Sequence, residues 1–368
     1  MITPFRIDIP QADLDDLTDR LARTRWPAEL PLPGAGSEYG VEITRLRELA
    51  DYWQYGYDWR AHEARLNELP QFTTGIDGAN IHFLHIRSAA GPDALPLLLA
   101  HGWPGSIVEF LDVIEPLSED FHLVIPSMPG FGLSGPTHET GWSAERIAHA
   151  YAELMLRLGY DTYGVQGGDW GMGIALLLAA YEPDRVVGVH LNYLPTLPPP
   201  GAELDGLPAE DLERIARTRA YVAAPHGHMV VQSTRPHTLG YALTDSPVGQ
   251  LAWITEKFDE WTDPALRPVD RDRLLTNVML YWLTGTAPSS ARLYKESFAD
   301  RTKPKPCPVP LGVAVFPHDL ALPSRALAER AYGTLTHWTE FDRGGHFAAI
   351  EAPELLAGDV REFFGKLA

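Results

Sequence analysis

The sequence predicts an α/β fold in which a mostly parallel, doubly wound sheet is covered by helices. Short apolar runs bounded by turn residues recur along the chain, and runs of this length suit strands buried on both faces. Helical patterns at residues 143–158 and 171–181 fall between such runs, and this alternation is typical of parallel strands joined by crossover helices. The expected strands lie in HFLHIRS, PLLLAHGWPG, HLVIPSMPG, YGVQGGDWG, VVGVHLNYL, PLGVAVFP and LTHWTEFDRGGHF.

The composition indicates a globular chain that binds no nucleic acid. Of the 368 residues 45% are hydrophobic, and 30 basic against 49 acidic side chains give a net charge of −19, which would repel a phosphate backbone. The apolar stretch at 172–180 is far shorter than the roughly 20 residues that cross a bilayer. The single cysteine, Cys307, forms no internal disulfide. Because the first residues also lack the pattern of a signal peptide, we expect a cytoplasmic protein without a membrane anchor.

Two proline-rich seams divide the chain into four predicted parts. The seams lie at 194–200 and 303–310, and strand patterns stop at the first and resume after the second. The segment between the seams is therefore predicted to be an insertion into the α/β core. The predicted domains are an N-terminal meander packing on the core at 1–75, the first part of the core at 76–200, a helical cap at 201–304 and the second part of the core at 305–368.

The cap and the meander are predicted to be helical. Apolar residues recur there with the period of a helix. Trp26, Trp53 and Trp59 of the meander are interpreted as packing residues and not as binding residues. The helices are expected at 209–223, 246–261, 271–284 and 289–301 in the cap, at 11–23 and 43–69 in the meander, and at 324–332 in the last part of the core.

The strongest chemical signal is the segment GGDWG at 167–171, where a predicted strand passes into a helix. Small residues on both sides permit a strained turn that exposes the Asp169 side chain at the edge of the sheet. Such a turn usually carries serine. A serine that attacked an alkyl carbon would leave an ether, whereas aspartate leaves an ester that water can cleave. Asp169 is therefore predicted to attack an alkyl carbon, in preference to the alternative that it only caps the following helix.

Ester cleavage requires a base that activates water. His346 follows the last predicted strand in a glycine-rich loop, and Asp319 follows the preceding strand, where its carboxylate can orient the imidazole. The chain order Asp169, Asp319, His346 is the order nucleophile, acid, base that α/β-hydrolases show. The sequence therefore predicts an α/β-hydrolase fold with a catalytic triad.

The backbone N–H groups of Trp103 and Trp170 are predicted to form the oxyanion hole of this site. Trp103 lies in the sharp turn HGWPGS after a strand, and Trp170 directly follows the candidate nucleophile. The pair His226 and His228 has neither a neighbouring cysteine nor a zinc-binding motif. We therefore predict no metal and no other cofactor.

These motifs resemble the microsomal-type epoxide hydrolases, which are α/β-hydrolases with an N-terminal meander and a helical cap. The resemblance implies that Asp169 is the nucleophile, His346 the base and Asp319 the orienting acid, where many relatives have glutamate. Membrane-anchored relatives have an apolar N-terminal helix, whereas this sequence starts with the meander, so no anchor is expected. From RTRWP near Trp26 to the end of the chain, the matching stretches include HGWPGS, PSMPGFGLS, LMLRLGY, QGGDWG, DSPVGQLAWITEKFDEWT, YWLTGT and RGGHFAAIEAPELLAGDVREF.

In this family two cap tyrosines hold and protonate the departing epoxide oxygen. Tyr294, in ARLYKE, matches one of them, and His228 stands where the other is expected. An imidazolium at His228 could donate a proton in a pH-sensitive way, because the reference pKa of histidine is near 6.5. Alternatively Tyr221 or Tyr241 substitutes, or Tyr294 acts alone; Tyr221 and Tyr241 are better interpreted as core aromatics of the cap.

The leading hypothesis is an epoxide hydrolase that needs no cofactor and forms a vicinal diol. We expect an alkyl ester on Asp169, proton donation by Tyr294 with help from His228, and ester hydrolysis by water that His346 activates. One alternative is a haloalkane-type dehalogenase, which would need halide-binding donors in place of Tyr294. Another is a homologue that binds a small ligand and is catalytically silent. The histidine at 228 would then reflect the loss of catalysis.

The expected partners are an apolar epoxide and water, and a homodimer is left open. The interpretation of the substrate as apolar rests on aromatic residues of the core and cap. These aromatic residues are Trp103, Trp170, Trp282 and Phe131.

Overall fold

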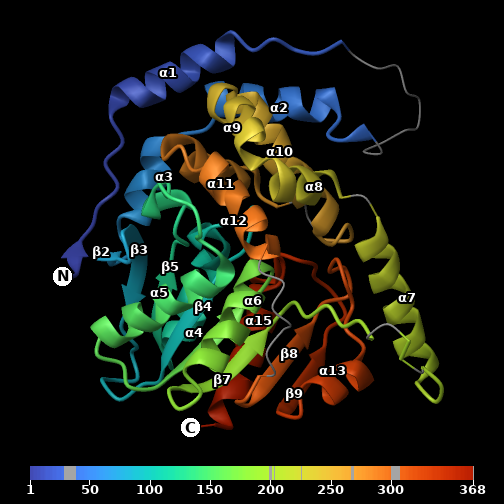
Figure 1. The fold of residues 1–368 in the computed structure, drawn as a ribbon. Helices are drawn as coiled ribbons and strands as arrows, with labels where there is room; N and C mark the ends of the chain where they lie inside the picture. The colour runs from blue at the N-terminus through green and yellow to red at the C-terminus, as the bar shows by residue number, and fades with distance from the viewer. Residues whose placement is uncertain are drawn as a thin grey trace.

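A nine-stranded sheet forms the centre of the molecule (Figure 1). The computed structural model describes residues 1–28, 39–198, 201–202, 204–224, 226–266, 269–299 and 307–367. Its strands are β1 (Thr3–Pro4), β2 (Gln71–Ile76), β3 (Ala79–Ile86), β4 (Pro96–Ala100), β5 (His122–Pro126), β6 (Tyr163–Gly167), β7 (Val186–Leu191), β8 (Leu311–Val315) and β9 (Leu335–Glu340). They lie in the order β1-β2-β3-β5-β4-β6-β7-β8-β9. The strands from β5 to β9 pair in parallel, and β1, β2 and β3 extend one edge antiparallel.

The predicted α/β fold with a mostly parallel sheet is confirmed. Every residue of β4, β5, β6 and β8 is buried, as expected when both faces of a strand are covered. Helix α5 packs against α6, and α15 packs against α4. The core helices are α4 (Leu111–Ser118), α5 (Ala144–Arg157), α6 (Trp170–Tyr181), α13 (Arg325–Ala331), α14 (Ala348–Glu351) and α15 (Pro353–Gly365), with the short 3₁₀ turns η2 (Ile107–Phe110) and η3 (Gly132–Ser134).

In its described residues, 1–28 and 39–75, the N-terminal meander contains three helices where two were expected. They are α1 (Gln11–Ala22), α2 (Ile43–Tyr55) and α3 (Trp59–Leu66). The expectation of one helix over 43–69 was wrong, because the chain turns at Gly56 and α3 starts anew at Asp58, whose carboxylate accepts the N–H of Ala61. Trp53 and Trp59 are each only 4% exposed, so they pack as predicted. Trp53 Nε1 donates to Met279 Sδ, which shows that the meander packs on the inserted segment as well as on the sheet.

The inserted segment forms six helices in the part that the structure describes. They are α7 (Ala209–Ala223), α8 (Gly227–Thr234), α9 (Pro236–Asp245), α10 (Pro247–Trp261), α11 (Arg271–Leu283) and α12 (Ala287–Ala299). The four predicted helices are present, although the predicted end at 301 lies outside the described residues. Helices α8 and α9 were not predicted, because they are short and Pro236 separates them. Figure 1 shows the helices α8 to α12 between the sheet and the N-terminal helices α1 and α2, both of which contact α10.

Candidate active site

Asp169 lies at the turn between β6 and α6 in a strained backbone conformation. Its φ of 47° and ψ of −124° fall in a region that non-glycine residues occupy only at a cost of roughly 1–3 kcal/mol. The neighbouring glycines are required by space: a Cβ at Gly167 would lie 2.4 Å from Gly171 O, and one at Gly171 would lie 1.9 Å from Ala100 O. The tight turn therefore places the Asp169 side chain at the carboxyl end of the parallel strands, as the sequence predicted.

One oxygen of the Asp169 carboxylate is already held by a backbone donor. The N–H of Trp103 donates to Asp169 Oδ1 over 2.8 Å. Gly102 permits this approach, since a Cβ there would lie 2.3 Å from Asp169 Cβ. Trp170 is the first residue of α6, so its N–H has no acceptor within the helix. The structure thus places the N–H of Trp103 against Asp169, and Trp170 stays a predicted second donor.

The other oxygen of Asp169 faces an imidazole that a second carboxylate orients. His346 Nε2 lies 3.4 Å from Asp169 Oδ2, and His346 Nδ1 lies 2.7 Å from Asp319 Oδ1. Asp319 follows β8 and His346 follows β9; the two loops are joined by the N–H of His318, which donates to Gly344 O. The structure therefore brings together the three residues that the sequence selected from distant parts of the chain.

The charges around His346 keep its imidazole protonated when Asp169 is ionised. Burial lowers the pKa of His346, but the charge of Asp319, and the hydrogen bonds and charge of Asp169, outweigh burial and raise this pKa to about 10. The two carboxylates thus share one imidazolium between them. Loss of either negative charge would lower the pKa of His346 again.

Tyr294 and His228 approach this group from the inserted helices. Tyr294 on α12 is 3% exposed, and its ring packs edge-on against Trp170 at 4.9 Å and Trp103 at 5.7 Å. Burial, and then the charge of Asp169, raise the pKa of Tyr294 well above 10, so its hydroxyl keeps its proton at neutral pH. His228 on α8 stacks on Trp103 at 5.4 Å and lies 5.9 Å from Tyr294, ring to ring. The structure therefore places His228 beside Tyr294.

The environment of His228 favours the neutral imidazole. Burial, with Lys257 adding to the effect, lowers the pKa of His228 to about 3, so the imidazolium that the sequence suggested is disfavoured near pH 7, although a neutral ring still has one N–H to donate. Tyr241 is 71% exposed and so does not replace His228. Tyr221 lies near enough to the site to be affected by its charges: burial, followed by the charges of Asp169 and Asp319, raises the pKa of Tyr221 well above its usual value of 10.

Sequence reasoning missed Glu109, Asn192 and Tyr193. Glu109 and Asn192 line a small cavity together with Asp169 and His346, and the Tyr193 ring lies 5.3 Å from the His346 ring. The signal that could have found Asn192 and Tyr193 is their place directly after β7, since the carboxyl ends of parallel strands share one edge of the sheet. Glu109 lies in η2, three residues after the HGWPGS turn.

Of the four aromatic residues that favoured an apolar substrate, the structure places two against Tyr294. Trp103 and Trp170 do contact Tyr294, but Trp282 lies under the Arg20 guanidinium of α1, 6.0 Å from its ring. Phe131 is buried against Tyr281 and His101. The reason is that helix α11, which carries Trp282, lies near the meander, a contact that sequence periodicity does not reveal.

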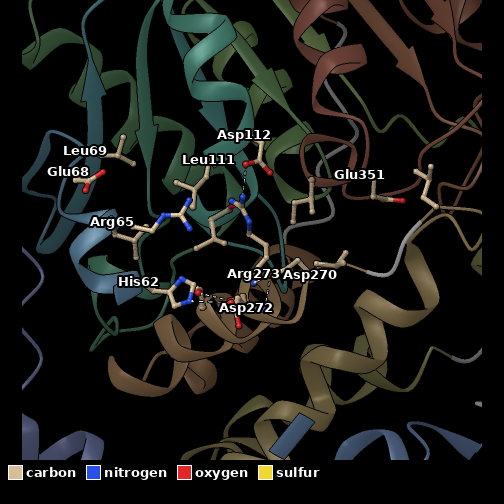
Figure 2. Close-up of a pocket in the computed structure, with 16 residues that line it drawn as sticks. His62, Arg65, Glu68, Leu69, Leu111, Asp112, Asp270, Asp272, Arg273 and Glu351 are labelled. Carbon is tan, nitrogen blue, oxygen red and sulfur yellow. Dashed lines mark hydrogen bonds and ion pairs between the residues drawn. The ribbon is translucent and has the colours of Figure 1, made fainter. Parts of the chain in front are cut away.

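A much larger cavity lies away from these residues. It measures about 760 Å³ and is lined by charged side chains, including Arg65, Asp270 and Asp272 (Figure 2). Figure 2 shows Arg273 pointing toward Asp112, and their closest atoms lie 2.6 Å apart. None of the predicted site residues lines this cavity. In the part of the chain that the structure describes, no three His, Cys, Asp or Glu side chains are grouped as metal ligands.

The sheet topology and the aspartate at the turn after β6, facing a histidine after β9, define an α/β-hydrolase. Two family models match, "Epoxide hydrolase N terminus" over residues 2–110 and "alpha/beta hydrolase fold" over 96–281. Epoxide hydrolase 1 of Sus scrofa is 36% identical, and the match covers 100% of this chain and 89% of that protein. The chain belongs to the epoxide hydrolase family and is an epoxide hydrolase.

Solved structures agree with this assignment. The structure of Aspergillus niger epoxide hydrolase has a TM-score of 0.91 and 34% identity, and covers 100% of this chain and 97% of that chain. Juvenile hormone epoxide hydrolase from the silkworm Bombyx mori also has a TM-score of 0.91 and 34% identity, covering 100% and 95%. Among the described residues no helix has both the length and the apolar character needed to cross a membrane.

Proposed function

We propose that the protein opens its epoxide in two steps through an alkyl ester on Asp169. The observation that supports this most directly is that the two oxygens of the Asp169 carboxylate have different neighbours. Oδ1 accepts the N–H of Trp103, whereas Oδ2 faces His346. Oδ2 is therefore the oxygen that attacks an oxirane carbon, and Oδ1 becomes the carbonyl oxygen of the ester in the oxyanion hole.

In the first step the carbon–oxygen bond of the ring breaks as the bond to Oδ2 forms. The departing oxygen takes a proton from the Tyr294 hydroxyl, and the neutral His228 ring beside it donates a hydrogen bond. Burial keeps the hydroxyl of Tyr294 protonated until the alkoxide develops. The aromatic rings around Asp169, those of Trp103, Trp170 and Tyr294, favour an apolar epoxide.

In the second step water attacks the ester carbonyl of Asp169. Esterification removes the charge of Asp169, which is one of the two charges that raise the pKa of His346. His346 then releases its proton, which returns through solvent to the Tyr294 phenolate, and the neutral ring becomes a base for water. Asp319 holds the ring through Nδ1. Water adds to the carbonyl carbon as His346 takes one of its protons, the bond from this carbon to Oδ2 breaks, and the departing diol oxygen takes the proton of the new carboxyl group, which restores the carboxylate.

A single turnover in ¹⁸O-water tests this route. With enzyme in excess over styrene oxide, one ¹⁸O atom should enter the carboxylate of Asp169, because water attacks the carbonyl carbon of that residue and not the substrate. The first diol released should carry ¹⁶O. Mass spectrometry of the peptide that contains Asp169 and of the diol measures both. Label that enters the first diol directly would refute the ester.

A further inference from the structure

A cavity of the size of one water molecule is lined in part by the reacting Asp169. It measures about 10 Å³ and is lined by Asp169, His346, Gly102, Glu109 and Asn192, among others. About this volume is the least that holds a water molecule, which also needs two to four polar partners. The cavity therefore has the size and the polar groups for a single water next to the imidazole and the ester carbonyl.

Glu109 contributes a carboxyl group to the lining of this cavity. Its Oε1 atom is buried and has no hydrogen-bond partner among the described residues. Burial raises the pKa of Glu109 to about 8, although the charge of His346 and the N–H groups of Gly102 and Ser106 act against this shift. A buried polar atom without a partner is costly, so its retention points to a ligand.

The loop around Glu109 is shaped to admit the carboxyl group. A Cβ at Gly105 would lie 1.3 Å from Glu109 Oε1, so any side chain at 105 would displace the carboxyl group. Glu109 thus reaches beneath the same turn, HGWPGS, that supplies the Trp103 N–H to Asp169.

Asn192 provides a second fixed polar group in the cavity lining. Its Oδ1 accepts from Gln166 Nε2 over 2.7 Å, which sets the orientation of the amide and leaves its NH₂ group to bind elsewhere. A Cβ at Gly168 would lie 2.7 Å from this amide, so the glycine next to Asp169 lets Asn192 come close to the turn.

We propose that Glu109, together with Asn192, binds the water molecule that His346 directs at the Asp169 ester. The inference rests on the proposed two-step route and assigns Glu109 to its second step alone. The water donates one proton to His346 Nε2 as its oxygen bonds to the carbonyl carbon, while the Glu109 carboxyl and the Asn192 amide hold it in line. Glu109 has no part in opening the epoxide, because the proposed donors to the epoxide oxygen, Tyr294 and His228, do not line this cavity.

The variants Glu109→Met and Glu109→Gln test this role, because ester formation and ester hydrolysis can be measured separately in each. Methionine keeps the length of the side chain without a hydrogen bond, and glutamine keeps the hydrogen bond without the charge. With styrene oxide, rapid-quench mass spectrometry measures ester formation and ester decay. We expect Glu109→Met to form the ester within about 3-fold of the wild-type rate and to hydrolyse it about 50-fold or more slowly, as expected for loss of a positioned reactant. Glu109→Gln should recover most of the loss.

Glu115→Met is the matched control, because Glu115 is exposed on the neighbouring helix α4, and both rates should stay at the wild-type values. Wild-type ester decay in Glu109→Met would overturn the inference, as would an equal loss in both steps. If His346→Gln and the wild-type protein also formed no ester, the proposed two-step route would fail instead, so the two failures are distinguishable.

Stability gives an independent readout. The pKa of Glu109 rises from 4.5 to about 8 in the folded protein, so its proton favours folding below pH 4.5 and this contribution is lost as the pH rises to 8. Glu109→Gln should therefore raise the thermal midpoint more at pH 8 than at pH 5. A residue kept for structure would lower the midpoint at both pH values, and that result would count against a water-binding role.

Discussion

The two sides of the active site are held together by different interactions. On the core side, Asp169, His346 and Asp319 are linked by polar contacts of 2.7 to 3.4 Å between loops that end parallel strands. On the cap side, Tyr294 and His228 are positioned by ring packing, with their ring centres 5.9 Å apart. Polar contacts depend on the identity of each atom, whereas ring packing accepts any planar side chain of suitable size. The core side therefore requires these particular residues, whereas the cap side accepts the exchange of one ring side chain for another.

The largest effect should follow from breaking the core side at His346. In His346→Gln the nucleophile and the Tyr294 hydroxyl remain, so the ester should still form. Its hydrolysis should slow by on the order of 10³-fold, the range of a lost general base. After incubation with styrene oxide, mass spectrometry should find Asp169 carrying one substrate mass.

Asp169→Ala is the matched control for this experiment, because it should neither turn over nor gain mass. If the Asp169 peptide of His346→Gln stays unmodified after long incubation, His346 does not act in the second step alone. Such a result would mean that the two sides of the site do not divide the reaction as proposed.

A smaller effect is expected from the cap side at Tyr294. Tyr294→Phe keeps the ring contacts to Trp103 and Trp170 and removes only the hydroxyl. Ester formation should slow by about 10²-fold, the lower end of the range for a general acid, because the His228 ring remains as a hydrogen-bond donor. Stopped-flow tryptophan fluorescence can follow this step through Trp103 and Trp170, and ester decay should keep the wild-type rate. An unchanged rate of ester formation would remove Tyr294 from the reaction.

The same contrast explains how far the sequence could predict the site. Asp169, Asp319 and His346 were predictable, because each follows a strand of the parallel sheet and parallel strands bring their carboxyl ends to one edge. The strained turn at Asp169 was also readable, since only small residues permit it. Periodicity likewise predicted the sheet, because buried strands are apolar throughout.

What the sequence did not predict has both local and long-range causes. The break between α2 and α3 at Gly56 and the boundary of α8 and α9 at Pro236 are local, whereas the position of Trp282 beside Arg20 follows from packing of the meander on the inserted helices. Glu109 was missed for a different reason. Glu109 stands out because its Oε1 atom is buried and has no hydrogen-bond partner among the described residues. The burial of a single atom becomes visible only in the folded chain.

The smallest effect should come from His228, where the site tolerates exchange. His228→Phe keeps a ring that can stack on Trp103 and removes one hydrogen-bond donor, so ester formation should slow by about 2- to 10-fold, the equivalent of about 0.5–1.5 kcal/mol. Because the pKa of His228 is lowered to about 3, its ring stays neutral between pH 5 and 9 and contributes no titration there. The pH profile of ester formation should therefore be the same in His228→Phe, His228→Tyr and the wild-type protein.

His228→Tyr sharpens this prediction, because a phenol restores a donor at the position where the family resemblance implies tyrosine. Its rate of ester formation should equal or exceed that of the wild-type protein. A wild-type rate that declines between pH 6 and 8, with a decline that His228→Tyr abolishes, would show that a protonated His228 donates to the epoxide oxygen. In that case the charge of the cap residue, and not its ring, would matter, and the distinction between the two sides of the site would not hold.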